Sequence, residues 1–381
     1  MKVEQLVEFL LDKGYSAKDT VPPFLNDVGA RRQPRDSVLG LAVSRAGTAL
    51  VQRLISQGAD VYLKQHFHDT TTALVQFGEG MEQVHDVTTL HMASLFWNAN
   101  VVKLLLEYDY YHRNKTSPDL VSSRDMNGRL SLHWAAAGPG LEECKLLDKD
   151  LSVKITETFR LLISSNPASI NLPDDTGSTP LHYAVQAHAT CGGSKHAKSA
   201  IQCLLEHGAD PKLPDGRGQS VLHMLVPRSL QGGPIQTTLL ELLMAHGVNV
   251  NQADKNGNTA LHVMVQNLRQ TAVVKCLLDH GAHIQLTNTI GETAFHAAAR
   301  GYLLDQTRCN EAYKRATVKD AVQAQDCMMR ILQAAAGENT NTIMSQQNKD
   351  GKTPRELLEE TRSQRHEIEQ QMRGGQPIEG R

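Results

Sequence analysis

The chain has 381 residues and a formal net charge of −2, so no overall basic field favours nucleic acid as a partner. Its hydrophobic content of 40% is sufficient for a buried core, yet no apolar run approaches the ~20 residues that a membrane span requires. The six cysteines form no regular framework and the first residues form no cleavable signal pattern, which indicates reduced thiols and a cytoplasmic or nuclear protein.

The amino-terminal region, residues 1–35, is predicted to hold a capping helix over residues 3–13, ended by Gly14, and then a linker. An array of repeated units follows, and residues 37–42 form a first unit that lacks the histidine of the later ones. The segment 65–87 lengthens the turn between the first and second units.

Six later segments read Ser/Thr-x-Leu/Phe-His, and their histidines are His91, His133, His182, His223, His262 and His296. The second segment departs from the pattern, because Leu130 stands where the Thr would be. A Ser or Thr hydroxyl can accept hydrogen bonds from the unpaired N–H groups at a helix start, so each segment predicts the beginning of a helix. The histidines lie about one repeat apart, too far to share a metal ion, and we expect them to be structural.

Apolar second helices follow most of these segments, and they end at Gly58, Gly208, Gly247 and Gly281. We expect these glycines to adopt the left-handed conformation that lets the chain turn sharply. Trp134 and Tyr183, which directly follow motif histidines, are predicted to be core residues.

The carboxyl-terminal part of the chain holds a last, weaker unit at residues 351–358 and a highly charged helix that runs to Arg373. A terminal repeat needs a polar outer face, so we expect residues 359–373 to cap the array, with partner binding as the alternative role. Residues 374–381 are predicted to be a flexible tail, and residues 378–381 resemble the remnant of a protease recognition site.

This pattern resembles the ankyrin-repeat family. Residues 254–262, residues 273–278 and the Gly281-Ala282 pair carry the full family pattern, and weaker copies cover residues 36–358. The resemblance implies an all-α fold with short β-hairpin-like turns, an ankyrin-repeat solenoid of about eight repeats. It also implies that hydrogen bonds to the motif Thr and to neighbouring backbone hold each motif histidine.

Several repeats are longer than the family's unit. Successive motif histidines lie 42, 49, 41, 39 and 34 residues apart, compared with about 33 for an ankyrin unit. The extra residues are predicted to lie between the two helices of four repeats, around residues 138–153, 191–194, 231–234 and 301–322. The last of these insertions is rich in Lys, Arg and Ala, which favours a helix.

Catalytic signatures are absent from the sequence: no nucleophile elbow, phosphate-binding glycine loop, zinc-protease helix or catalytic carboxylate pair is found. We therefore predict a protein that is not an enzyme and needs no cofactor. The carboxylate doublet Asp174-Asp175 precedes Gly177, where hydrogen bonding within a turn explains it.

Two groups of residues have the chemistry of metal ligands, and neither has the spacing of a zinc site. His66, His68 and His85 form the first group, and His188, Cys191 and His196 form the second. We expect solvated loop residues in both places and no metal, with an independent site in the insertions as the alternative.

The family's partner-binding positions are the variable residues of the turns and those after the first helix. Carried over to this chain, they are Met126, Asn127, Arg129, Asp175, Thr176, Ser178, Gln186, Arg217, Gln219, Arg228, Lys255, Asn256, Asn258, Gln266, Asn267, Thr289, Ile290, Glu292 and Arg300. The resulting concave groove is polar and mildly basic, so we expect an acidic or amide-rich partner.

Our leading hypothesis is a monomeric, non-enzymatic scaffold that binds a partner protein or peptide in this groove. The alternative is a regulatory or targeting domain of a larger enzyme or membrane protein. The family resemblance also suggests a modification, since Asn251 stands where some ankyrin repeats are hydroxylated on asparagine.

Overall fold

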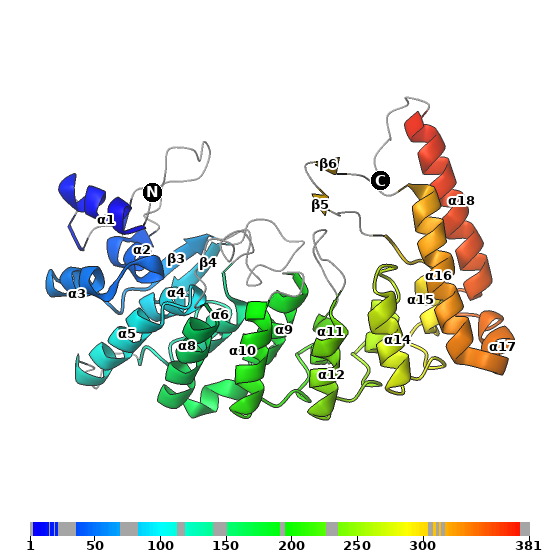
Figure 1. Cartoon of the computed structure of the whole chain (residues 1–381), viewed down its shortest axis with the longest axis horizontal. Coiled ribbons are helices and arrows are strands. Elements are labelled where there is room, and N and C mark those ends of the chain that lie inside the picture. Colours follow the sequence, from blue (N-terminus) through cyan, green and yellow to red (C-terminus); the bar gives the residue numbers. More distant parts are fainter. Residues whose placement is uncertain are drawn as a thin grey trace. The chain divides into compact units, whose positions relative to one another are not determined.

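The structure, a computed structural model (Figure 1), consists of two compact units, residues 1–210 and 211–381. It describes residues 3–14, 16–18, 20–21, 36–68, 83–112, 119–139, 151–190, 195–225, 235–303, 308–309, 312–313 and 317–373. The boundary at Asp210 falls inside the array predicted for residues 36–358, whose bounds remain a prediction.

The first unit is built from pairs of antiparallel helices joined by extended turns. Its helices are α1 (Val3–Asp12), α2 (Val38–Arg45), α3 (Thr48–Ser56), α4 (Thr89–Leu95), α5 (Ala99–His112), α6 (Ser131–Ala137), α8 (Leu151–Ser165), η1 (Pro167–Asn171), α9 (Pro180–Thr190) and α10 (Lys195–Glu206). Two antiparallel ladders accompany them, β1 (Thr20–Val21) with β2 (Asp36–Ser37) and β3 (Gln65–His68) with β4 (Gln83–Val87). Helix α4 packs between α2 and α6, and α6 packs on α9, so the first helices form one stacked layer with the second helices beside it.

The second unit repeats this arrangement. Its elements are α11 (Val221–Met224), α12 (Thr237–Ala245), α13 (Ala260–Met264), α14 (Thr271–Asp279), α15 (Ala294–Ala299), β5 (Arg308–Cys309), β6 (Ala312–Tyr313), α16 (Val318–Ala336), η2 (Gly337–Asn339), α17 (Thr340–Met344) and α18 (Pro354–Arg373). Helix α13 packs between α11 and α15, while α14 packs between α12 and α16. Each unit therefore has the mostly helical, repeated architecture that the sequence predicts.

The motif histidines tie each first helix to the next repeat. In α13, the Nδ1 atom of His262 accepts a hydrogen bond from the Thr259 backbone N–H (3.2 Å) and contacts the Thr259 hydroxyl (2.9 Å). The Nε2 atom then donates to the Glu292 carbonyl in the following turn (3.0 Å). The same link to the next turn is made by His91, His133, His223 and His296. Their predicted structural role is confirmed.

The helix ends also agree with the sequence. Helix α1 ends before Gly14, and the four glycines predicted to close second helices all have positive φ, between 80° for Gly247 and 94° for Gly208. Trp134 and Tyr183 are buried, as predicted. Cys203 and Cys276 are buried on α10 and α14, and burial raises the pKa of the Cys203 thiol to about 11.

The fourth insertion differs from the prediction. Its described residues include the short β5–β6 ladder, and the helix expected over 301–322 begins only at Val318. The reason is local, because Thr317 caps α16: its backbone N–H donates to the Asp320 carboxylate (2.9 Å), and its hydroxyl accepts from the Asp320 N–H (3.2 Å). Residues 226–234, in the third insertion, and the tail 374–381 lie outside the described residues.

Among the residues that the structure describes, no helix combines the length and the apolar composition needed to cross a membrane.

Candidate partner-binding surface

Four turns of the second unit share one construction. Each begins with an Asp or Asn whose side-chain oxygen accepts hydrogen bonds from the backbone two and four residues later. In the turn at Asp254, the donors are the N–H groups of Asn256 (2.9 Å) and Asn258 (2.8 Å). The turns that begin at Asp215, Asn288 and Asn348 are built in the same way. The side chain therefore fixes the loop and leaves the second and third residues of each turn at the tip.

Backbone hydrogen bonds join successive turns of this unit into a row. Lys255 N donates to the Arg217 carbonyl (2.9 Å), Thr289 N donates to the Asn256 carbonyl (2.8 Å), and Lys349 N donates to the Ile290 carbonyl (2.9 Å). The exposed side chains at the tips are those of Arg217, Lys255, Asn256, Thr289, Ile290, Lys349 and Asp350, which we call the turn-tip row. Their backbone is fixed, so little ordering would be needed when a partner binds.

The turn-tip row carries positive charge that the described protein does not neutralise by direct pairing. Neither Arg217 nor Lys255 forms an ion pair with any residue in the described ranges. Arg300, in contrast, pairs with Glu292, whose side chain is only 5% exposed. Arg300 therefore supports the turn at Glu292, and the Glu292 carboxylate largely neutralises its charge.

Lys349 was not among the predicted binding residues, because the positions carried over from the family ended at Arg300. The signal was present, since Asn348, Gly351 and Thr353 repeat the turn pattern of the earlier units. The turn there uses the same hydrogen bonds, with Asn348 N donating to the Lys352 carbonyl (2.9 Å).

The remaining predicted residues of the second unit are less exposed. Gln219, Asn258 and Gln266 are half-buried, and Asn267 and Glu292 are buried. Asn267 and Glu292 are therefore not surface positions, which corrects the prediction for them. Arg228 lies outside the described residues.

In the first unit, the predicted residues divide between surface and core. Met126 and Asp175 are exposed at turn tips, where Asp175 N donates to the Asn127 carbonyl (3.1 Å). Thr176 is exposed, while Asn127, Ser178 and Gln186 are half-buried.

Arg129 requires a correction, because it is 1% exposed and cannot meet a partner from that position. Its Nε atom donates to the Asp125 carboxylate (2.7 Å), and its guanidinium lies 5.7 Å from the centre of the Trp134 ring. The indole N–H of Trp134 donates to the same carboxylate oxygen (2.9 Å). The buried carboxylate and the aromatic ring explain why a cation can lie in this core.

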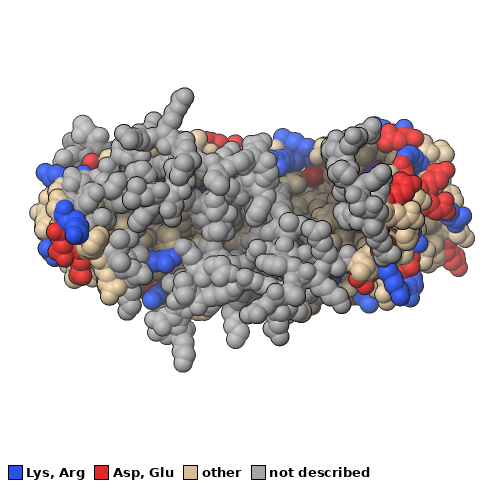
Figure 2. Space-filling model, turned by 90° about the horizontal axis from the view of Figure 1, so that it is seen from above, with Lys and Arg blue, Asp and Glu red and all other residues tan. Residues whose placement is uncertain are grey.

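Charge is distributed differently at the end of the second unit that α16 and α18 occupy. Figure 2 shows acidic and basic side chains interspersed on its described surface. Arg362 of α18 joins the two helices, since it donates to the Gln325 amide oxygen and forms an ion pair with Asp326, both on α16. The alternating charges suit a solvated outer face.

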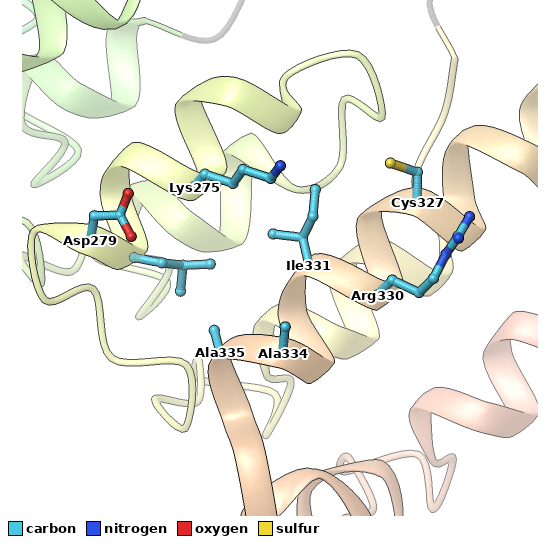
Figure 3. Close-up of a pocket in the computed structure, with 8 residues that line it drawn as sticks. Lys275, Asp279, Cys327, Arg330, Ile331, Ala334 and Ala335 are labelled. Carbon is cyan, nitrogen blue, oxygen red and sulfur yellow. The ribbon is translucent and has the colours of Figure 1, made fainter.

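A separate cavity of about 560 Å³ lies between α14 and α16 (Figure 3). Aliphatic side chains, among them Leu278 and Ile331, line it together with Lys275, Asp279 and Arg330. The lining includes the exposed thiol of Cys327 but no histidine that could act as its base. The arrangement is that of a shallow groove between the second helices of neighbouring repeats.

The sequence predicted no metal site, although two groups of residues have the chemistry of metal ligands. Among the described residues, no group of three or more His, Cys, Asp and Glu side chains is placed to hold a metal ion. His66 and His85 of the first group do come together, as described below. The side chains of His188, Cys191 and His196 lie outside the described part of the chain.

Comparison with known proteins identifies the repeats. Residues 187–288 and 229–311 match the family model described as ankyrin repeats in three copies. The chain is 32% identical over 130 residues to the palmitoyltransferase ZDHHC13 of Mus musculus, a match covering 33% of this chain and 17% of that protein. It is 26% identical over 148 residues to inversin of Canis lupus familiaris, covering 38% of this chain and 11% of that protein. The matches thus span only a small part of either relative.

Among solved structures, the chain is similar to the ankyrin repeat domain of Bcl-3, titled a unique member of the IkappaB protein family. The sequence identity is 19% and the TM-score is 0.45, over 72% of this chain and 97% of that one.

Proposed function

Because the chain is an ankyrin-repeat protein, we propose that it is a non-enzymatic scaffold that binds a partner protein through the turn-tip row of its second unit. Ankyrin repeats are protein–protein interaction domains, and the function of a given array depends on its surface chemistry. The observation that supports this surface is the set of backbone hydrogen bonds that join its turns.

The side chains of the row favour an acidic partner. Arg217, Lys255 and Lys349 are exposed cations, and only Asp350 opposes them at the tips. Asn256 and Thr289 add groups that can hydrogen bond, and Ile290, 45% exposed, adds apolar area. We therefore propose a partner segment with carboxylates and at least one apolar side chain.

We further propose that the protein is a monomer inside the cell, in the cytoplasm or nucleus. A second candidate function is that of a regulatory or targeting domain. The similarity to part of a palmitoyltransferase supports it, because that relative is much longer than the region matched here. In either case the repeats themselves would bind and not catalyse.

The experiment is affinity capture from native lysate with three proteins, read by mass spectrometry. The first is the wild type and the second carries Arg217→Glu and Lys255→Glu. The matched control carries Lys275→Glu and Arg330→Glu, which reverse two exposed cations on α14 and α16. A partner retained by wild type and control but lost by the turn-tip variant is the expected result.

The captured partner is then purified and its affinity for all three proteins is measured by calorimetry. We expect the turn-tip variant to bind at least about tenfold more weakly and to lose part of the salt dependence. Equal binding by all three proteins would move the partner site to the insertions at residues 138–153 or 301–322. Circular dichroism establishes that each variant is folded.

A further inference from the structure

The β3–β4 ladder of the first unit brings two histidines together. Phe67, Val84 and Val87 of this ladder are buried, so one of its faces packs on the core. His66 and His85 come from the two different strands and are both half-exposed. Nineteen positions separate them in the sequence, so only the pairing of the strands makes them neighbours.

The two imidazoles meet through their Nδ1 atoms, which are in direct contact. Their ring centres lie 4.3 Å apart and the ring planes are nearly perpendicular, at 88°. Two imidazole nitrogens, each able to act as a metal ligand, thus lie together at an accessible surface. Imidazole nitrogen is a preferred ligand of Zn²⁺ and Cu²⁺, with metal–nitrogen distances of about 2.0–2.1 Å for zinc, so an ion that binds both rings would replace their direct contact and move the two Nδ1 atoms apart.

Both strands are held in place by the neighbouring repeats. The Gln65 side chain, at the start of β3, accepts from the Ser37 backbone N–H (2.9 Å) and hydroxyl (3.0 Å). In β4, the His85 carbonyl accepts from Met126 N (3.1 Å), which belongs to the next turn. The strands that carry the two histidines are therefore positioned by the scaffold before any ligand arrives, which favours binding.

The charges nearby are compatible with a cation. Lys64 precedes the first strand, and its amine lies 3.7 Å from the carboxylate of Asp86, the residue after His85. This pairing reduces the repulsion that the lysine would exert on a metal ion, and the carboxylate adds negative potential beside the imidazoles.

We propose that His66 and His85 bind a divalent transition-metal ion through their Nδ1 atoms, with water completing the coordination. The described residues provide no third side-chain ligand in a group, so the ion remains exchangeable. Cu²⁺ should bind more tightly than Zn²⁺, as is general for nitrogen sites. Metal binding would join the two strands.

The test uses the full chain, freed of metal by a chelator and then titrated with CuCl₂ or ZnCl₂ alone. We expect one Cu²⁺ to bind, with nitrogen hyperfine splitting in its electron paramagnetic resonance spectrum. His66→Ala and His85→Ala should each weaken the affinity by at least about tenfold. His283→Ala, which removes another exposed imidazole of the chain, is the matched control and should bind as the wild type does.

Two results would overturn the proposal. One is equal Cu²⁺ affinity in the wild type, His66→Ala, His85→Ala and His283→Ala proteins, and the other is a wild type that binds no metal. Thermal unfolding of the metal-free variants shows whether each is folded. If an alanine variant is unfolded, His66→Asn is measured in its place. This variant keeps a polar side chain but has no imidazole, so it should also fail to bind the metal.

Discussion

The imidazole of His262 shows how a single side chain joins two repeats. Its Nδ1 atom accepts from Thr259, so its proton lies on Nε2, which donates to the Glu292 carbonyl. The ring is thus neutral, and burial lowers its pKa from the usual value of 6.5. A buried, neutral histidine at each repeat has two consequences that can be measured.

The first consequence concerns stability. His262→Ala leaves the Thr259 N–H and the Glu292 carbonyl without this partner, and each such buried group costs about 1–3 kcal/mol. We expect a clear fall in the unfolding free energy, measured by urea denaturation and circular dichroism. His283→Ala, at an exposed position, should change it by less than about 0.5 kcal/mol. Equal effects of the two changes would contradict the proposed role.

The second consequence is pH dependence. Desolvation lowers the pKa of His91 and of His133 to about 4 in the folded state. In the unfolded chain both take up protons below about 6.5, so unfolding is favoured as the pH falls. Their contribution is fully present above pH ~6.5 and is lost progressively towards pH 4. At pH 5 each should cost roughly 2 kcal/mol relative to pH 8.

Tryptophan fluorescence can follow this effect in the first unit, because Trp97 and Trp134 are the chain's two tryptophans. Urea unfolding between pH 5 and pH 8 should show the loss of stability. In His133→Gln the slope with pH should decrease, since one titrating group has been removed. An unchanged slope would show that other groups dominate the pH dependence.

The role of a residue could be predicted where its place in the repeat motif determines it. It could not be predicted where the role depends on contacts that form only in the folded chain. The histidines, Trp134 and Tyr183 follow from their places in the repeat. Arg129 occupies a variable turn position, and only the folded chain encloses it with the Asp125 carboxylate and the Trp134 ring.

At the scale of elements, the turns as well as the helices hold successive repeats together. Gly257 has φ of 76°, and a Cβ there would lie 2.9 Å from both Asn288 Cα and Thr289 N. Gly351 has nearly the same φ, 74°, but nothing within 4 Å of its Cβ position. These two glycines therefore separate the conformational cost of a side chain from its steric cost.

We expect Gly257→Ala to be more destabilising than Gly351→Ala. Both alanines would have to adopt positive φ, at a cost of about 1 kcal/mol or more. Only Gly257→Ala also pushes apart the backbones that form the Thr289–Asn256 hydrogen bond. The comparison requires urea denaturation of each protein, and a larger effect at Gly351 would contradict this account.

Elements with local signals were predicted well. Caps predicted the starts of the first helices in the repeats, and terminal glycines predicted the ends of α1 and of several second helices, because these residues satisfy helix ends directly. The ladders β3–β4 and β5–β6 were not predicted as strands. Their strands have two to five residues, which is too short for apolar alternation to distinguish a strand from a loop.

At the scale of the whole molecule, stability in a repeat protein depends on the contacts between neighbouring units. The number of repeats could be predicted, since a recognisable sequence motif marks each repeat. The division into two compact units could not, because no composition change marks Asp210. The array predicted from residue 36 to residue 358 is therefore best tested at one of its ends, where a helix packs on a neighbouring repeat on one side only among the described residues.

Helix α18 is such an element. It packs on α15 and α16, buries Leu357, and its Arg365 donates to the Gly301 carbonyl. Its other face is charged and exposed, which suits the capping role predicted for residues 359–373. Removing residues 354–381 would expose the apolar surface of α15 and α16 to water.

We expect the chain of residues 1–353 to unfold at lower urea concentration than the full chain and to self-associate, because uncovered repeats present apolar surface. A chain of residues 1–373, which keeps α18, is the control and should behave as the full chain does. Sedimentation at several protein concentrations measures the association. If α18 served only to bind a partner, residues 1–353 would remain monomeric with an unchanged unfolding midpoint, and the helix would belong with the turn-tip row among the surfaces to test for binding.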